Sequence, residues 1–451
     1  MPTHVPAWLL TPADPNLLVP QLWSSGVAKG PGGELTVAGV PVSQIAREFG
    51  TPSYVVDEAD LRARARGFKE AFAECDVFYA AKANLSVELA RWIDAEGLGL
   101  DVCSEGELAC ALHAGFDPAR IGFHGNNKSV GELVTAVECG VGRIIVDSRE
   151  EIDRLAAVAA DRRVVQDVLV RVKPGVEAHT HTYIATAHED QKFGFSLDGE
   201  AAAAMASVSS APSLRLRGLH SHIGSQIFDS AGFQVAVGRV LALYAEGLAA
   251  GMPLGELDIG GGFGIAYTTR DSPQDPHVLA ASIERVVGDT CHALSIPRPR
   301  LSLEPGRAIA GPSTFTLYEV GTVKTVRLDS GGSRLYVAVD GGMSDNIRAA
   351  LYGADFSCTL ASRSSDAPAT LARVVGKHCE TGDVLVRDEF LPGDTRPGDL
   401  IAVPGTGAYC RSLASNYNHV TRPAVVAVLD GSARVIVRRE TVDDLLRLDV
   451  T

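Results

Sequence analysis

The chain has 451 residues, 46% of them hydrophobic and 21% charged, and its formal net charge is −14 at pH 7. This composition is typical of a globular protein with a sizeable core and two or three domains. The negative charge argues against a protein that binds nucleic acid through its phosphates. No apolar stretch approaches the ~20 residues that span a bilayer. The N-terminal residues lack the pattern of a signal peptide, and no two of the eight cysteines form a C-x-x-C pair. We therefore expect a cytoplasmic protein that binds neither membrane nor nucleic acid.

Short apolar runs alternate with amphipathic stretches over residues 57–312. Eight of these runs are typical of strands: 77–81, 98–103, 120–125, 143–148, 167–172, 216–224, 256–260 and 300–305. Several intervening segments open with Ser or an acidic residue and close on Gly, as helices do. Eight strands alternating with helices over about 250 residues predict a (β/α)8 TIM-like barrel. A doubly wound open sheet is the alternative.

Residues 313–451 have a different pattern, in which β-branched runs are separated by Gly, Asp and Pro turns. This pattern predicts a mostly antiparallel β domain, either a sandwich or a barrel. Within residues 1–56, ELTVAGVPV and PSYVV are candidates to contribute strands to this domain, because the chain passes it before entering the barrel. The predicted fold class is α/β, with an N-terminal segment (1–56), a barrel (57–312) and a β domain (313–451).

Polar residues follow nearly every predicted barrel strand, where barrel enzymes build their active sites, although loops are polar in any case. Lys82 in YAAKAN follows an apolar strand, and partial desolvation there would lower its pKa and free its amine for a Schiff base. A solvated surface lysine is the alternative. His220 and His222 face one side of a strand, but no third metal ligand stands at the usual spacing, so we expect no metal and a structural role for His220.

Glycine and arginine motifs follow the last two predicted strands. In ELDIGGGFG, three successive glycines expose backbone N–H groups, which suits a phosphate, although such a motif alone is weak evidence. In EPGRAIAGP, Arg307 can bind phosphate or carboxylate through its planar fork, and an ordinary turn with a surface ion pair is the alternative.

YAAKAN, HSHIGS, GGGFG and EPGR together resemble the fold-type III pyridoxal-phosphate enzymes, the group of alanine racemase and ornithine decarboxylase. The resemblance implies that Lys82 binds pyridoxal 5′-phosphate covalently, that His222 stacks on its ring, and that Glu304 keeps the ring nitrogen protonated. EPGR is the mark of the decarboxylase branch, because racemases place an arginine opposite that nitrogen. The further cofactor contacts that it implies are Ser225, Gly261, Gly262, Pro305, Gly306, Arg307 and Tyr409.

GKHCETGD in the β domain matches a segment that, in this family, enters the active site of the partner subunit. The resemblance therefore implies a homodimer with shared active sites, in which Cys379 donates a proton to the product and Glu380 binds the distal amine of the substrate. The catalytic set that it implies is Lys82, His222, Glu304 and Cys379, and the substrate-binding set is Arg307, Arg348, Tyr352, Glu380 and Tyr409. Residues 177–194 are expected to form a mobile lid.

These motifs look like the branch of the family that decarboxylates a small amino acid, meso-2,6-diaminopimelate, to L-lysine and CO2. Three alternatives remain open. The first is a decarboxylase of the same fold that acts on ornithine, arginine or carboxynorspermidine. The second is a cofactor carrier without catalytic activity, and the third is a metal-dependent barrel hydrolase.

Overall fold

A computed structural model of the chain describes residues 5–176, 191–329 and 331–450, so most of the predicted lid (177–194) lies outside the described residues. The chain divides into two compact units. The barrel unit comprises Arg64–Gly264 and Pro273–Ala308. The β unit comprises the described residues up to Ala63, Ile265–Ser272, and those from Ile309 onward. The barrel sequence is thus inserted within that of the β unit.

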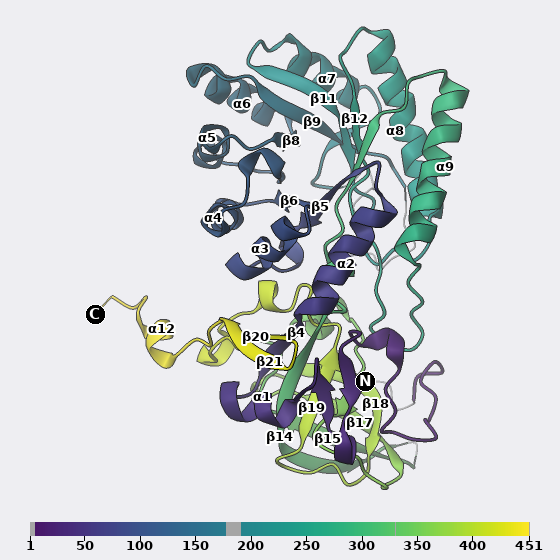
Figure 1. Cartoon of the computed structure of the whole chain (residues 1–451), viewed down its shortest axis with the longest axis vertical. Helices are drawn as coiled ribbons and strands as arrows, with labels where there is room; N and C mark the ends of the chain where they lie inside the picture. Colours follow the sequence, from purple (N-terminus) through teal and green to yellow (C-terminus); the bar gives the residue numbers. More distant parts are fainter. Residues whose placement is uncertain (1–4, 177–190, 330, 451) are drawn as a thin grey trace. The chain divides into compact units, whose positions relative to one another are not determined.

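Eight parallel strands close into a barrel in the barrel unit (Figure 1). They are β5 (Asp76–Ala80), β6 (Gly99–Val102), β7 (Ile121–Phe123), β8 (Arg143–Val146), β9 (Gln166–Lys173), β11 (Leu214–Ser221), β12 (Glu256–Asp258) and β13 (Arg300–Leu303). Neighbours pair in this order, and the pairs β8–β9 and β13–β5 complete the ring, while β10 (Phe195–Ser196) adds to β9. The predicted barrel is confirmed, and the alternative of an open sheet is wrong.

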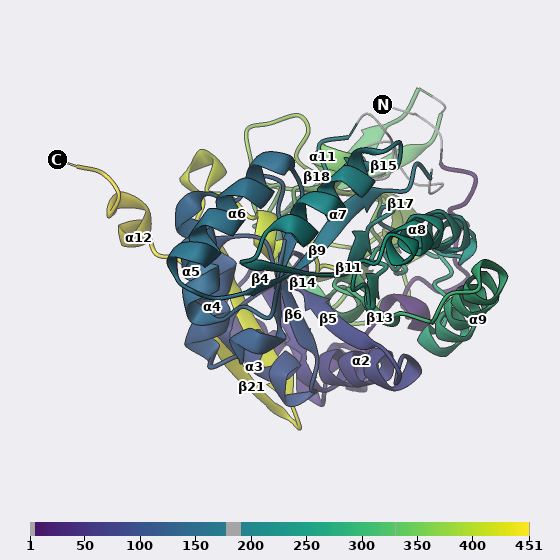
Figure 2. The ribbon, with the colours of Figure 1, turned by 90° about the horizontal axis from the view of Figure 1, so that it is seen from above.

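Helices surround the barrel strands, as Figure 2 shows from above. They are α3 (Val87–Ala95), α4 (Glu105–Ala114), α5 (Val130–Cys139), α6 (Arg149–Asp161), α7 (Glu200–Ser210), α8 (Ala231–Ala249) and α9 (Pro276–Leu294), with α2 (Glu58–Ala71) leading in. The side chains of Ser86, Ser104, Ser129 and Ser148 accept hydrogen bonds from the first turns of α3 to α6, as N-caps do. No helix of the described residues is long and apolar enough to cross a membrane.

The β unit has a mostly antiparallel sheet in the order β18-β17-β15-β14-β4-β20-β21. Its strands are β4 (Ser53–Asp57), β14 (Thr314–Arg327), β15 (Ser333–Val339), β17 (Ala369–Val375), β18 (Val384–Pro392), β20 (Ala424–Leu429) and β21 (Ser432–Val437), with β16 (Thr359–Leu360) and β19 (Leu400–Pro404) joined through β14. The segment PSYVV supplies β4, which pairs antiparallel with β14 and parallel with β20. A strand from the start of the chain therefore lies inside this sheet.

The segment ELTVAGVPV does not join the large sheet. It forms β2 (Leu35–Val37) and β3 (Val40–Pro41), which with β1 (Val27–Lys29) make a separate three-stranded sheet that packs on the same apolar core as β14 and β20. The remaining helices are α1 (Val42–Phe49), α10 (Arg307–Ala310), α11 (Arg348–Tyr352) and α12 (Val442–Leu446). Single 3-10 turns are η1 (Pro20–Leu22), η2 (Pro31–Gly33), η3 (Ala81–Ala83), η4 (Pro118–Arg120), η5 (Arg411–Leu413) and η6 (Tyr417–His419).

Candidate active site

Charged or ionisable side chains lie in or just beyond the carboxyl ends of the barrel strands, at the rim where barrel enzymes bind their substrates. Along the chain they are Lys82, Asp101, His124, Asp147, Arg171, His220 with His222, Asp258 and Glu304. Asp101, His124, His220, Asp258 and Glu304 are buried, so their charges interact strongly.

Lys82 stands on the single turn η3, directly after β5. The Tyr79 hydroxyl donates to the Asn84 carbonyl at 2.8 Å and fixes this turn. Lys82 is exposed, which differs from the partial desolvation expected at the strand exit, because the turn carries it past the buried strand end. The positive charge of Lys82 nevertheless contributes to the downward pKa shift of His222, so the two side chains interact.

Close backbone contacts between neighbouring loops account for the glycines at this rim. A Cβ on Gly261 would lie 2.1 Å from the Glu304 carbonyl oxygen, and one on Gly262, whose φ is +105°, would lie 2.2 Å from the Gly224 carbonyl oxygen. A Cβ on Gly306 would lie 2.9 Å from Cβ of Ala80. No larger residue fits at these positions without moving the backbone, so the glycines bring the loops after β5, β11, β12 and β13 together.

His222 is held as a neutral imidazole beside the glycine loop. The backbone N–H of Gly261 donates to its Nδ1 at 3.2 Å, so this nitrogen accepts and carries no proton. Burial, followed by the charges of Lys82 and Arg171, lowers the pKa of His222 well below its usual value. A neutral ring next to a lysine can pack against a flat aromatic ligand without adding charge.

Glu304 lies at the centre of the buried cluster. Its Oε1 is 2.9 Å from Nε2 of His124 and 3.3 Å from Nε2 of His220. Burial opposes ionisation of Glu304, but the two imidazoles outweigh it and hold the pKa of this carboxyl well below its usual value. Glu304 is therefore a buried anion, able to accept a proton-bearing ring nitrogen.

Ser225 and Arg307 form a polar pair, in which Nη2 of Arg307 donates a hydrogen bond to the Ser225 hydroxyl oxygen at 2.8 Å. A guanidinium next to a hydroxyl is suited to binding a phosphate. The predicted cofactor residues of the barrel unit thus offer an amine, a neutral imidazole, a buried anion and a phosphate-binding pair. This set of groups fits pyridoxal 5′-phosphate.

Arg348 is a buried arginine of the β unit that lacks a carboxylate partner at two of its nitrogens. Nε and Nη1 make no hydrogen bond with any residue that the structure describes. Its guanidinium carbon lies 4.7 Å from the ring centre of Tyr267, 5.8 Å from that of Phe356 and 5.9 Å from that of Tyr409. The rings stabilise the buried cation, but a buried charge without hydrogen-bond acceptors is costly, so Nε and Nη1 of Arg348 are suited to bind a ligand carboxylate.

Tyr352 and Tyr409 are half-buried residues of the β unit. Tyr352 ends α11, the short helix that begins at Arg348, so the two lie one turn apart. Tyr409 has a φ of +63°, a conformation that is rare outside glycine and clusters at functional sites. The structure thus brings Arg348 near Tyr409 and Tyr352 within the β unit.

Cys379 and Glu380 are exposed on the loop between β17 and β18. The preceding residue, His378, is buried, with Nδ1 at 3.0 Å from Asn418 Oδ1 and Nε2 at 2.8 Å from the Ser344 hydroxyl. The side chains of Cys379 and Glu380 therefore point outward from an anchored loop, an arrangement that can serve a second subunit.

A buried ion pair ties the loop after β7 to the first turn of α6. Lys128 lies 2.6 Å from Glu151, and both side chains are only 1% exposed. The ammonium also donates to the carbonyls of Gly125 and Ile145, each at 2.7 Å, so all three of its hydrogens have acceptors. This pair supports the part of the rim that carries His124.

The partners of Glu304 could not be predicted from the sequence. His220 was expected to be a structural histidine with satisfied hydrogen bonds, yet neither ring nitrogen makes a directed hydrogen bond within the described residues, and its Nε2 faces Glu304. His124 is one of the polar residues that follow the predicted barrel strands, and its sequence motif indicates no role for it. The ligand atoms of His124, His220 and Glu304 lie within 4.8 Å of one another, a spacing also compatible with a metal ion. No spacing along the chain indicates this cluster, because its members come from three different strands.

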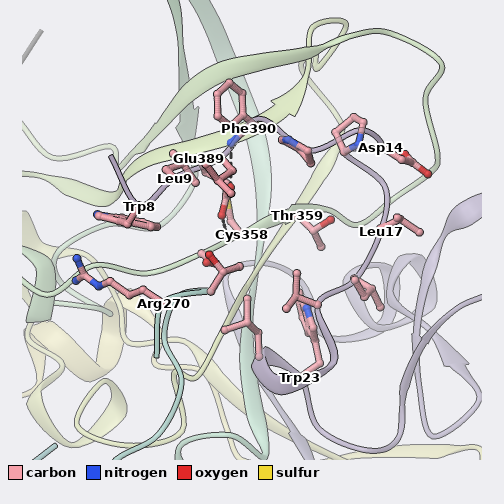
Figure 3. Close-up of a pocket in the computed structure, with 18 residues that line it drawn as sticks. Trp8, Leu9, Asp14, Leu17, Trp23, Arg270, Cys358, Thr359, Glu389 and Phe390 are labelled. Atoms are coloured by element: carbon pink, nitrogen blue, oxygen red, sulfur yellow. Dashed lines mark hydrogen bonds between the residues drawn. The ribbon is translucent and has the colours of Figure 1, made fainter. Parts of the chain in front are cut away.

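A cavity of about 380 Å³ lies within the β unit (Figure 3). The N-terminal segment covers it with Trp8, Leu9 and Leu17, and Glu389 and Phe390 face these from β18. Arg270 stacks on Trp8, with its guanidinium carbon 4.8 Å from the ring centre. None of the predicted cofactor or substrate residues lines this cavity, so we assign it no part in catalysis.

Comparison with known families places the chain in a class of enzymes. Residues 58–311 match the family model described as "Pyridoxal-dependent decarboxylase, pyridoxal binding domain". The chain belongs to the family of pyridoxal-dependent decarboxylases, as the motifs of the barrel predict.

Relatives that align over nearly their whole length share a more particular name. The chain is 56% identical over 440 residues to "Diaminopimelate decarboxylase" of Mycobacterium bovis, covering 96% of this chain and 98% of the relative. It is 44% identical over 424 residues to the protein of the same name from Bacillus subtilis, covering 93% and 95%. The crystal structure of diaminopimelate decarboxylase from Helicobacter pylori complexed with L-lysine has a TM-score of 0.82 and 30% identity, and the match covers 90% of this chain and 98% of that one.

Proposed function

We propose that the chain is a pyridoxal-phosphate-dependent decarboxylase that converts meso-2,6-diaminopimelate to L-lysine and CO2. The observation that carries this proposal is the buried, partly unpaired guanidinium of Arg348, which calls for a substrate with a second carboxylate. The names of the relatives support the same substrate. A decarboxylase of ornithine, which has no second carboxylate, has no use for such a group.

Pyridoxal phosphate, when bound, supplies an electron sink for the electrons left behind when CO2 departs. Lys82 would hold its aldehyde through the ε-amine, and Glu304 would keep a proton on the ring nitrogen because this carboxylate is an anion at neutral pH. The neutral ring of His222 would pack on the cofactor face, and the Ser225–Arg307 pair would bind the phosphate.

The substrate would be oriented by its far end. Arg348 would bind the distal carboxylate, and Tyr352 and Tyr409 would line the same region. Glu380 would bind the distal amine, and the Cys379 thiol would deliver a proton to the carbon that has lost CO2. Since both residues are exposed on the β unit, we propose that they act in the site of a second copy, within a homodimer.

Reductive labelling tests the cofactor assignment. The purified protein is incubated with pyridoxal phosphate, reduced with borohydride, digested and analysed by mass spectrometry. We expect the label on Lys82, no label and no turnover in Lys82→Ala, and an unchanged result in Lys324→Ala, which alters an exposed lysine of the β unit. A label on another peptide would overturn the proposed chemistry.

A substrate panel then separates the remaining alternatives. Diaminopimelate, ornithine, arginine and carboxynorspermidine are supplied in turn, and the products are identified by mass. We expect lysine from diaminopimelate and negligible product from the others, since a polar pocket discriminates strongly against analogues that leave it unpaired. Loss of activity with a chelator, with resistance to borohydride, would instead support a metal-dependent hydrolase at the cluster of His124, His220 and Glu304.

A further inference from the structure

Two imidazoles reach the same oxygen of Glu304 across the interior of the barrel. His124 follows β7, His220 lies in β11, and Glu304 follows β13. Neither β7 nor β11 is a neighbour of β13 in the sheet. The contacts to Oε1, at 2.9 Å and 3.3 Å, therefore depend on closure of the barrel and not on strand pairing.

The two imidazoles and a second carboxylate form a compact buried group. The rings of His124 and His220 pack edge to face, with centres 4.9 Å apart and planes at 69°. Asp101 Oδ1 lies 3.5 Å from the same Nε2 of His124 that contacts Glu304. All four side chains are buried, so their mutual contacts set the orientation of each.

We infer that His124 is a positioning residue for Glu304. Oε1 makes no directed hydrogen bond within the described residues, so the imidazole of His124 holds it by electrostatic attraction, with His220 as a second contact. This attraction keeps the carboxylate ionised and turned toward the ring nitrogen of the cofactor. Both histidine contacts are to Oε1, so neither histidine occupies Oε2, the other oxygen of the carboxylate. This inference rests on the proposed function and extends it to a residue that belongs to neither the predicted cofactor-binding set nor the predicted substrate-binding set.

The charges of the cluster are consistent with this role. Burial disfavours protonation of His124, but the carboxylates of Asp101 and Glu304 outweigh it and the net shift of the His124 pKa is upward. Burial lowers the pKa of His220, so of the two imidazoles it is His124 whose charged form the cluster favours. The other charged groups that act on the cluster include Lys82, Arg171 and Asp258, from the ends of β5, β9 and β12, and Glu107, from the first turn of α4.

A double-mutant cycle distinguishes positioning from a merely structural role. The four proteins are the wild type, His124→Asn, Glu304→Gln and the double variant. Each is stripped of cofactor, and the dissociation constant of pyridoxal phosphate is measured by titration, together with the visible absorption of the bound cofactor. His113→Asn, on the exposed side of α4, is the matched control.

We expect His124→Asn to raise this dissociation constant about 10- to 100-fold, as loss of an outer partner of a binding group typically does. In the Glu304→Gln background the same change should add less than about threefold, because the carboxylate through which it acts is already neutral. The absorption spectra of His124→Asn and Glu304→Gln should deviate from the wild type in the same direction, and His113→Asn should match the wild type. Equal factors in both backgrounds would overturn the inference.

A second position and a stability measurement keep the test decisive. If His124→Asn does not fold, His220→Asn enters the same cycle, with a smaller non-additive effect expected because its contact is longer. Urea denaturation of the cofactor-free proteins shows whether a weakened affinity merely follows a weakened fold. A wild type that does not bind pyridoxal phosphate refutes the proposed function, whereas a wild type labelled on Lys82 with additive variants refutes only the role of His124.

Discussion

Replacing Arg348 should separate activity from stability. The side chain in Arg348→Met has a similar length and is apolar. It can therefore pack against the rings of Tyr267, Phe356 and Tyr409. The guanidinium and its two nitrogens without a hydrogen-bond acceptor are removed. The variant therefore loses the proposed carboxylate-binding group without leaving a partner unpaired in the free protein.

The structure sets the expected size of both effects. Hydrogen bonds to charged groups contribute about 1.5–3 kcal/mol each, so two bonds from Nε and Nη1 of Arg348 to a substrate carboxylate amount to about 3–6 kcal/mol, or roughly 10²- to 10⁴-fold in kcat/KM. The free energy of unfolding should fall by no more than about 1 kcal/mol, because no buried ion pair is broken.

Lysine release from diaminopimelate, measured by mass spectrometry, gives kcat/KM, and urea denaturation gives the free energy of unfolding. Arg270→Met is the control, since Arg270 pairs with Asp355 at 2.8 Å and is 43% exposed. A loss of less than tenfold, or a loss accompanied by unfolding, would refute the role of Arg348.

Two further predictions concern the stability of each unit. Lys128→Met breaks the buried pair with Glu151 and should reduce the free energy of unfolding by about 3–5 kcal/mol. The control Lys324→Met, on the surface, should reduce it by less than about 0.5 kcal/mol. Urea denaturation measures both variants, and similar losses in the two would contradict the prediction. Burial raises the pKa of Asp345 from 3.8 to about 7, so the folded state binds a proton that the unfolded chain releases, and stability from this group is lost as the pH rises through that range. In Asp345→Asn the free energy of unfolding should decrease less between about pH 4 and pH 7 than it does in the wild type. The control Asp366→Asn, at an exposed position, should show the same decrease as the wild type. An unchanged decrease in Asp345→Asn would show that another group is responsible.

The barrel could be predicted from sequence because its signals are local. Each strand is a short apolar run, and Ser86 and Ser129 mark helix starts that the structure confirms. The pairing of the segment ELTVAGVPV could not be predicted, because its strands have only three and two residues and so show too short an alternation to indicate their partners. Its small separate sheet follows from tertiary packing onto the core of the β unit.

The site was predictable where a motif carries the chemistry and not where distant residues meet. Lys82, His222 and Glu304 stand in recognisable motifs, and the structure places them at the rim of one barrel. The contacts of His124 with Glu304 and the aromatic surround of Arg348 arise only when separate segments meet in the folded chain, so no local pattern contains them. The exposure of Lys82 depends on a single turn beyond its strand.

The place of β4 has a consequence for how the protein is made. This strand leaves the ribosome early, yet both of its neighbours, β14 and β20, are translated long after it, so the nascent β unit cannot close its sheet until synthesis is nearly complete. A truncated gene that starts at Ile309 would yield a product with two unpaired strand edges and a tendency to aggregate. Expression of the β unit alone therefore requires Ser53–Asp57 on the same chain, for example by linking the N-terminal segment directly to Ile309 in place of the barrel.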